Sequence, residues 1–102
     1  MAENRVVVIT GATGNLGQAV AGMAKQNGYR RALIGHNQER ILQVYDKSTD
    51  SQLLLGNLDV TDEKRVNEAV QGIIEYFGRI DALVHTVGAF VGGKPVDETP
   101  RE

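Results

Sequence analysis

Apolar and polar positions alternate along the chain in blocks that predict strands and helices in regular succession. Each predicted strand is a short apolar run, typical of a strand buried on both faces. Each predicted helix carries apolar residues three and four positions apart, which places them on one face. The predicted strands cover residues 6–9, 32–34, 53–60 and 80–84, and the predicted helices cover residues 16–26, 38–46 and 63–77.

The ends of the predicted helices carry residues expected of caps. Asn37 can cap the second helix, and either Thr61 or Asp62 can cap the third. Gly28 and Gly78 follow the first and third helices, at the position where a left-handed residue usually ends a helix. In the first helix, the spacing predicts one apolar face made of Leu16, Ala19, Val20, Met23 and Ala24.

Strands that alternate with helices imply a parallel sheet with right-handed crossovers. The predicted fold is therefore α/β and Rossmann-type, with strand order 3-2-1-4 and helices on both faces. A ligand crevice is expected above the first and fourth strands. Arg30 and Arg31, just before the second strand, are expected at the solvated lip of a loop.

Composition and charge narrow the classes of protein that this chain resembles. Its 102 residues make one domain at most, and a net charge of −2 gives no general attraction for nucleic acid or anionic membranes. No apolar run approaches the roughly 20 residues that a membrane span needs. The chain has no cysteine, which excludes disulfides and thiolate metal sites and fits a cytoplasmic protein. Its two histidines give no metal-site spacing, so no metal is expected.

The turn between the first strand and the first helix carries the clearest chemistry. It reads Thr10-Gly11-Ala12-Thr13-Gly14-Asn15-Leu16-Gly17, and its glycines let the backbone turn sharply and approach a ligand. Such a turn presents bare N–H groups at a helix N-terminus, where a pyrophosphate binds. Strand, glycine turn and helix together indicate a dinucleotide-binding unit. Another phosphate-bearing ligand, or a tight connection with no ligand, remains the alternative. No Gly-Lys-Ser/Thr follows, so the turn is not a P-loop.

Four patches, in matching order and spacing, resemble the short-chain dehydrogenase/reductase family. The glycine turn is similar to the Thr-Gly-x-x-x-Gly-x-Gly cofactor motif of that family. Leu58-Asp59-Val60-Thr61-Asp62 resembles the segment after the third strand, and residues 77–84 resemble the lead into the fourth. His85-Thr86-Val87-Gly88 stands where members usually carry Asn-Asn-Ala-Gly. The resemblance runs from about residue 5 to the end of the chain.

Asn15 is the one departure inside the glycine motif, because it occupies the family's second glycine position. Asn is the non-glycine residue most tolerant of a positive φ, so the turn can survive. Alternatively, Gly11, Gly14 and Gly17 fit the Gly-x-x-Gly-x-x-Gly spacing of the extended branch of the family. The later patches favour the shorter branch.

The resemblance implies a set of cofactor-binding residues in this chain. In the family, the Asp after the third strand and its following residue contact the adenine, which points to Asp59 and Val60. His85 is expected to be a strand-end hydrogen bonder rather than a catalytic base. The implied cofactor-binding residues are Gly11, Thr13, Gly14, Asn15, Leu16, Gly17, His36, Asn37, Asp59, Val60 and Gly88.

The end of the second strand favours NADP over NAD. NAD enzymes commonly place an Asp or Glu there to bond the ribose 2′-hydroxyl, whereas this chain reads Gly35-His36-Asn37. Related NADP-dependent members often have Arg where His36 stands. His36 can donate to a phosphate, and Arg40, one helical turn later, can supply lasting positive charge.

The resemblance implies hydride transfer between a nicotinamide and a carbonyl or alcohol, but the catalytic residues of the family are absent. The family uses a Ser and a Tyr-x-x-x-Lys pair, and no tyrosine here has Lys four residues later. Residues 99–102 read as the start of a further helix, so a fragment of a longer oxidoreductase is expected, with no catalytic residue of its own. A non-catalytic dinucleotide-binding or scaffold module is the alternative. A fragment of this kind is expected to self-associate through the free edge of its fourth strand.

Overall fold

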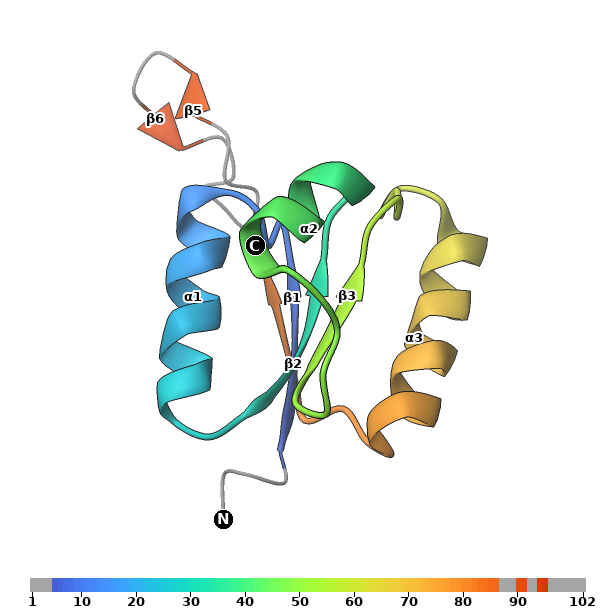
Figure 1. Ribbon diagram of the computed structural model, residues 1–102. Coiled ribbons are helices and arrows are strands. Elements are labelled where there is room, and N and C mark those ends of the chain that lie inside the picture. The colour runs from blue at the N-terminus through green and yellow to red at the C-terminus, as the bar shows by residue number, and fades with distance from the viewer. Residues whose placement is uncertain (1–4, 87–89, 92–93, 96–102) are drawn as a thin grey trace.

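The computed structural model describes residues 5–86 together with residues 90–91 and 94–95. Its centre is a four-stranded parallel sheet with the order β3-β2-β1-β4, which confirms the predicted order (Figure 1). Residues 90–91 and 94–95 form a separate antiparallel pair. The strands are β1 (Val6–Thr10), β2 (Arg30–Ile34), β3 (Gln52–Leu55), β4 (Ala82–His85), β5 (Phe90–Val91) and β6 (Lys94–Pro95).

Helices cover both faces of the parallel sheet, as predicted (Figure 1). They are α1 (Asn15–Gln26), α2 (Gln38–Tyr45) and α3 (Glu63–Phe77). The helices α1 and α2 lie on one face and α3 lies on the other, because right-handed crossovers run in one direction from β1 to β3 and then back past β1 to β4. No helix within the described ranges is long and apolar enough to cross a membrane.

Strand β1 supplies the core of both layers, since all five of its residues are buried. Its side chains alternate between the two faces, and so do those of β2. The layer under α3 contains Val6, Val8, Ala32, Ile34, Leu58, Ile73 and Phe77. The layer under α1 and α2 contains Val7, Ile9, Ala12, Ala21, Ala24, Leu33 and Ile41.

The helix ends follow the predicted cap chemistry. The Asn37 side chain accepts a hydrogen bond from the Arg40 N–H, and the Asp62 side chain accepts one from the Arg65 N–H. Of the two candidates for the third helix, Asp62 is therefore the cap. Gly78 has a left-handed φ of 89° directly after α3, as its position predicts.

The third strand is shorter than predicted, because β3 ends at Leu55 rather than near residue 60. Asn57 has a positive φ of 64°, which no strand residue adopts, and its carbonyl accepts a hydrogen bond from the Arg65 side chain. The Leu58 N–H turns back to the Gly35 carbonyl, at 3.1 Å. Residues 56–60 therefore form a loop over the end of β2.

The buried face of α1 matches the predicted face only in part. Ala24 is buried and Val20 packs against the core, as predicted, whereas Leu16 and Met23 are 52% and 64% exposed. Gly17 and Ala21, which were not predicted to face the sheet, are buried against it. Small side chains let the helix axis approach the strands closely, and the larger residues are turned outward.

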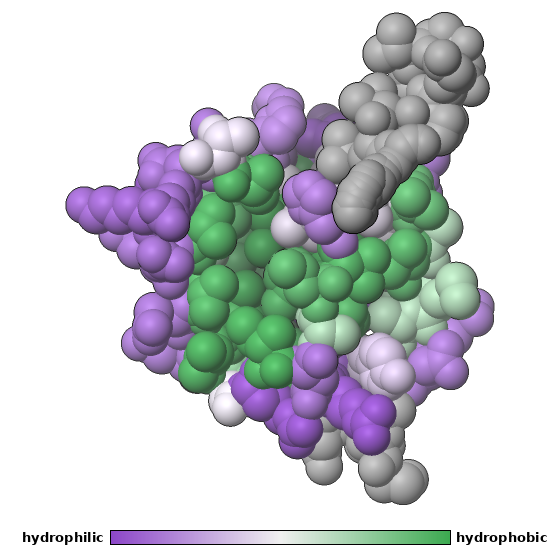
Figure 2. All heavy atoms as spheres, turned by 180° about the vertical axis from the view of Figure 1, so that it is seen from behind, coloured by the Kyte–Doolittle hydropathy of each residue, from purple (hydrophilic) through white to green (hydrophobic). Residues whose placement is uncertain are grey.

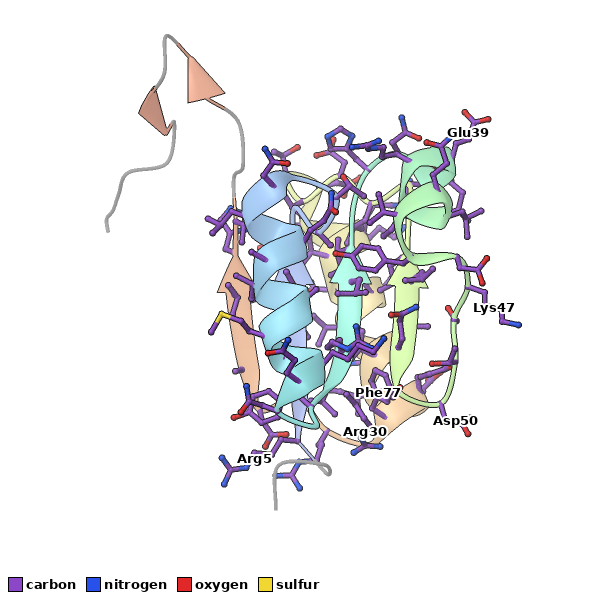
Figure 3. The ribbon with its side chains drawn as sticks, turned by 60° about the vertical axis from the view of Figure 1, so that its left-hand side comes forward. Arg5, Arg30, Glu39, Lys47, Asp50 and Phe77 are labelled. Carbon is purple, nitrogen blue, oxygen red and sulfur yellow. The ribbon has the colours of Figure 1, made fainter. Side chains whose placement is uncertain are left out.

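Arg30 and Arg31 lie in β2 and not at the lip of a loop. The aliphatic part of a long basic side chain can pack in a core layer, and Arg31 is only 4% exposed. The Arg30 guanidinium carbon lies 5.2 Å from the centre of the Phe77 ring. Figure 3 shows this pair at the amino end of the strands, opposite the end where Glu39 lies.

Candidate functional site

A cavity of about 360 Å³ opens at the carboxyl ends of the strands. It lies where the strand order reverses between β1 and β4, which is the usual ligand crevice of an open parallel sheet. The residues that line it are Thr10, Gly11, Thr13, Gly14, Ile34, Gly35, His36, Asn37, Leu58, Val60, His85 and Thr86.

The glycine turn delivers free N–H groups to one side of this cavity. Gly14 is the N-cap of α1 and gives no side-chain cap, and the first turn of the helix contains no acidic residue. The Gln18 N–H makes the first helical hydrogen bond, to the Gly14 carbonyl at 2.9 Å. The N–H groups of residues 15–17 come before this bond and so have no helical acceptor. An anion is therefore favoured here, by hydrogen bonds and by the helix dipole.

Two glycines of the turn are required by close backbone contacts. A Cβ on Gly11 would lie 2.1 Å from the Thr86 carbonyl oxygen, and Gly11 has a positive φ of 66°. A Cβ on Gly17 would lie 2.1 Å from the Gly11 carbonyl oxygen. Asn15 is the first residue of α1 and has no positive φ, so the tolerance of Asn for that conformation is not needed.

Residues at the end of β4 fasten the turn to the sheet. The Thr86 hydroxyl donates to the Thr10 carbonyl at 2.6 Å and lies 3.1 Å from the Gly11 carbonyl. His85 Nδ1 and Thr10 Oγ1 are 2.6 Å apart and share a hydrogen bond across the paired strands. The prediction that His85 is a strand-end hydrogen bonder is confirmed.

The segment after β2 forms the opposite side of the cavity. Gly35, His36 and Asn37 line it and include no carboxylate. The Asn37 side-chain oxygen accepts from the Arg40 N–H at 3.0 Å, so this oxygen holds the start of α2. The His36 side chain is exposed, and within the described residues its ring makes no hydrogen bond.

Asp59 lies beside the cavity as an ionised group. The Thr61 hydroxyl and the Thr61 N–H donate to its Oδ1 at 2.6 Å and 2.9 Å. These two bonds lower the pKa of the Asp59 carboxyl, and the nearby charges of His36 and Arg65 lower it further. One carboxylate oxygen is thus engaged by Thr61.

The structure gathers most of the predicted site residues around one cavity. Six of them line it: Gly11, Thr13, Gly14, His36, Asn37 and Val60. Asn15, Leu16 and Gly17 form the adjoining first turn of α1, whereas Gly88 lies outside the described residues.

Several residues that line the cavity were not among the predicted cofactor-binding residues, including Thr10, His85 and Thr86. The parallel register pairs Thr10 with His85, which places both at the same end of the sheet. A register derived from the apolar runs of the first and fourth strands would have indicated this pair.

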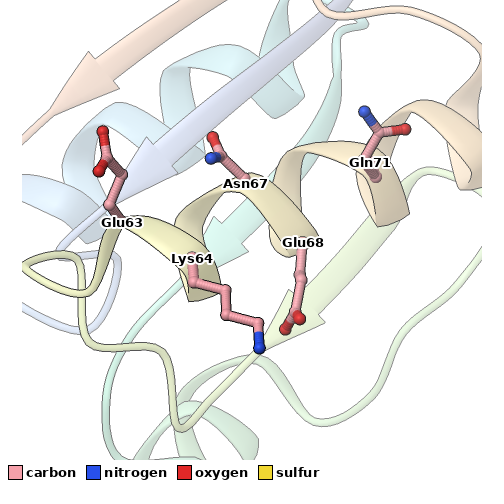
Figure 4. Close-up of a pocket in the computed structure, with 5 residues that line it drawn as sticks. All are labelled: Glu63, Lys64, Asn67, Glu68 and Gln71. Atoms are coloured by element: carbon pink, nitrogen blue, oxygen red, sulfur yellow. The ribbon is translucent and has the colours of Figure 1, made fainter.

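A second hollow, on the outer surface of α3, has the character of an ordinary solvated surface. Its lining residues, Glu63, Lys64, Asn67, Glu68 and Gln71, all come from a single helix (Figure 4). They are exposed, and no second element contributes a group. Within residues 5–86, no group of three or more His, Cys, Asp or Glu residues is placed to hold a metal ion.

The chain is similar in sequence and fold to several known proteins. An uncharacterized oxidoreductase of Staphylococcus epidermidis is 28% identical over 93% of this chain and 41% of its own length. A 3-ketoacyl-(acyl-carrier-protein) reductase of Brucella melitensis, solved with NADH, has a TM-score of 0.72 and 25% identity over 81% of this chain and 34% of its own. The structure of ElxO with NADP bound has a TM-score of 0.71 and 32% identity over 85% of this chain and 36% of its own.

The chain spans about two fifths of the length of the curated relatives that it matches. The profile of the short chain dehydrogenase family matches residues 5–102, which is nearly the whole sequence. The strand order of the parallel sheet and the uncapped glycine turn agree with this match. The chain therefore belongs to the short-chain dehydrogenase family.

Proposed function

We propose that this chain is the cofactor-binding part of an NAD(P)-dependent oxidoreductase, which transfers hydride between a nicotinamide and a carbonyl or alcohol. The observation that carries this proposal is the uncapped N-terminus of α1, which opens onto the cavity between β1 and β4. The bound NADH and NADP of two structural relatives support it.

The cofactor is proposed to lie across the cavity with its pyrophosphate on the glycine turn. The N–H groups of Thr13 and of residues 15–17 supply donors for the phosphate oxygens. The adenine ribose then lies near His36 and Asn37, and the adenine near Asp59 and Val60, with Gly88 proposed as a further contact. This arrangement uses the free donors of the turn and both walls of the cavity.

NADP is proposed as the preferred cofactor because no carboxylate lines the cavity at the end of β2. A ribose 2′-phosphate there would face His36, and Arg40 and the N-terminus of α2 would add positive potential. Glu39 and Asp59 are the nearby carboxylates, and one oxygen of Asp59 accepts two hydrogen bonds from Thr61.

The chemical step is proposed to need residues that this chain does not supply. No tyrosine lines the cavity among the described residues. Tyr45 and Tyr76 use their hydroxyls in hydrogen bonds to backbone carbonyls. A cofactor-binding module that holds the dinucleotide without turning it over is the alternative function for the isolated chain.

Calorimetric titration of the chain with NADPH and NADH tests the proposal directly. Binding of both, with NADPH tighter, is the expected result. ATP serves as the control ligand, because it offers phosphates and adenine without the nicotinamide half. Absence of heat with both dinucleotides would contradict the proposal, and equal binding of ATP would favour a more general phosphate site.

We further propose that the chain self-associates through the edge of β4. Within the described residues β4 pairs with β1 alone, and Leu83 on it is 64% exposed. An apolar groove of about 440 Å³ runs between this strand and α3, and Figure 2 shows that face as largely apolar. A second copy offers the same unpaired backbone groups, so two such edges can pair antiparallel. Sedimentation analysis that finds a monomer at high concentration would contradict this.

A further inference from the structure

We propose that Tyr45 is a positioning residue for the pyrophosphate site, acting on the glycine turn through the Ala12 carbonyl. This inference rests on the proposed dinucleotide function and adds a residue from a different helix to that site. Tyr45 is the last residue of α2 and lies 33 positions along the chain from Ala12.

The contact between Tyr45 and the turn is short and protected. The Tyr45 hydroxyl donates to the Ala12 carbonyl oxygen at 2.6 Å. Ala12 is fully buried, and its own N–H donates to the Ile34 carbonyl at 3.0 Å. If the Tyr45 hydroxyl were removed, the Ala12 carbonyl would lose this hydrogen-bond donor, and water could not easily replace it because the site is buried.

The Ala12 carbonyl controls the direction of a donor that faces the ligand. The carbonyl of Ala12 and the N–H of Thr13 belong to one planar peptide unit, and they point in opposite directions. Within residues 5–86 the Thr13 N–H has no hydrogen-bond acceptor, and Thr13 lines the cavity. By holding the carbonyl on the side of α2, Tyr45 keeps the Thr13 N–H aimed at the cavity.

The other carbonyls of the turn are held away from the ligand in the same manner. The Gln18 side chain donates to the Thr13 carbonyl at 2.8 Å, and the Thr86 hydroxyl donates to the Thr10 carbonyl at 2.6 Å. Carbonyl oxygens that faced a phosphate would repel it, so these donors keep the turn positive toward the cavity. Tyr45 completes this arrangement from α2.

Tyr45 is itself fixed at several points. The Gln52 side chain donates to the Tyr45 carbonyl at 3.0 Å, and the ring packs against the core layer under α1 and α2. Burial raises the pKa of the Tyr45 hydroxyl, with a smaller opposing effect from Arg31, so the group keeps its proton and remains a donor. The position of the turn is thereby connected to β3 through Tyr45.

The three tyrosines of the chain provide a matched experiment. Tyr45→Phe removes the hydrogen bond to the turn. Tyr76→Phe removes a similar bond, from the Tyr76 hydroxyl to the Thr49 carbonyl at 2.7 Å, far from the cavity. Tyr29→Phe removes a hydroxyl without a partner among the described residues, from a ring that packs in the same layer as Tyr45. For each variant, affinity for NADPH and NADH is measured by calorimetry, and folding by thermal melting.

Tyr45→Phe is expected to weaken both cofactors by the same factor, about three- to tenfold, because the Thr13 N–H serves the pyrophosphate that they share. Tyr76→Phe is expected to lower the melting temperature and leave both affinities unchanged, and Tyr29→Phe is expected to change neither. If thermal melting shows Tyr45→Phe partly unfolded at the titration temperature, the titration is repeated at a lower temperature at which the variant is folded, with the same expected weakening.

Each outcome decides between the two proposals. If the parent chain binds neither cofactor, the proposed function fails and this inference fails with it. If the parent chain binds and Tyr45→Phe binds equally well, the inference alone is overturned. If Tyr76→Phe weakens binding as much as Tyr45→Phe, the effect reflects lost stability, and the positioning role is refuted.

Discussion

Replacing Gly17 with alanine tests the proposed pyrophosphate site by adding a single carbon. The added Cβ would lie 2.1 Å from the Gly11 carbonyl oxygen and 2.8 Å from the Ala12 Cα. Both contacts are backbone atoms, so no flexible side chain can move aside to accommodate the methyl group.

The size of the effect follows from the distance that the backbone must move. Ordinary van der Waals contact begins at 3.4 Å, so α1 and the turn must separate by about 1.3 Å. A hydrogen bond of about 2.9 Å from an N–H of the first turn of α1 to a phosphate oxygen would then lengthen beyond the usual limit of about 3.2 Å. We expect an affinity loss of at least about tenfold for NADPH and NADH, and a stability loss of about 1–3 kcal/mol.

Gly22→Ala is the matched control, because it makes the same chemical change in the same helix. A Cβ on Gly22 has no neighbour within 4 Å. We expect unchanged affinity and a stability gain of up to about 1 kcal/mol, since alanine is the better helix former. Calorimetry and urea unfolding measure both quantities. If Gly17→Ala keeps its affinity within twofold of the parent chain, the pyrophosphate does not lie on this turn.

Three further predictions concern cofactor choice, association and acid stability. His36→Asp is expected to reverse the preference from NADPH to NADH by repelling the 2′-phosphate, and an unchanged affinity ratio in calorimetry would contradict the proposed ribose site. Leu83→Lys is expected to shift the chain toward monomer in sedimentation, because the charge would be desolvated at the paired edge, and an unchanged mass would count against the β4 interface. The Arg79 side chain and the Val6 N–H hold the pKa of Asp81 below its ordinary value. The stabilisation by this carboxylate is therefore complete at a pH above the ordinary pKa and is lost as the pH falls through the lower pKa of the folded state. Asp81→Asn is expected to flatten the acid limb of urea-unfolding stability, and identical limbs in the two proteins would refute this.

Local pattern was enough to predict the three helices, the four strands of the parallel sheet and their order. The apolar runs of β1 and β4, the caps at Asn37 and Asp62, and the glycine after α3 each act over a few residues. The glycine turn was predicted in the same way, because the spacing of its glycines indicates where the backbone must closely approach another part of the chain or a ligand.

What the sequence did not predict depends on contacts between distant residues. Arg31 is buried in β2, beneath the helices that cover that face, and the loop that follows β3 receives a hydrogen bond from the Arg65 side chain of α3. The hydrogen bond from Tyr45 to Ala12 joins two residues that are far apart in the sequence. Each of these features involves a contact with another element, and a local pattern of polar and apolar residues does not contain such contacts.

The hydrogen bonds of Thr86 have a consequence for the order in which the protein can be assembled. They join the end of β4 to the glycine turn across 76 and 75 positions of sequence, and Thr10 and His85 are likewise 75 positions apart. Long-range contacts of this kind form late, because the intervening chain must first be closed into a loop. During synthesis, we expect the turn made of residues 10–17 to emerge early and to reach its final shape only when residue 86 has docked. A dinucleotide bound to the finished turn would therefore stabilise the completed sheet and would not stabilise its first half.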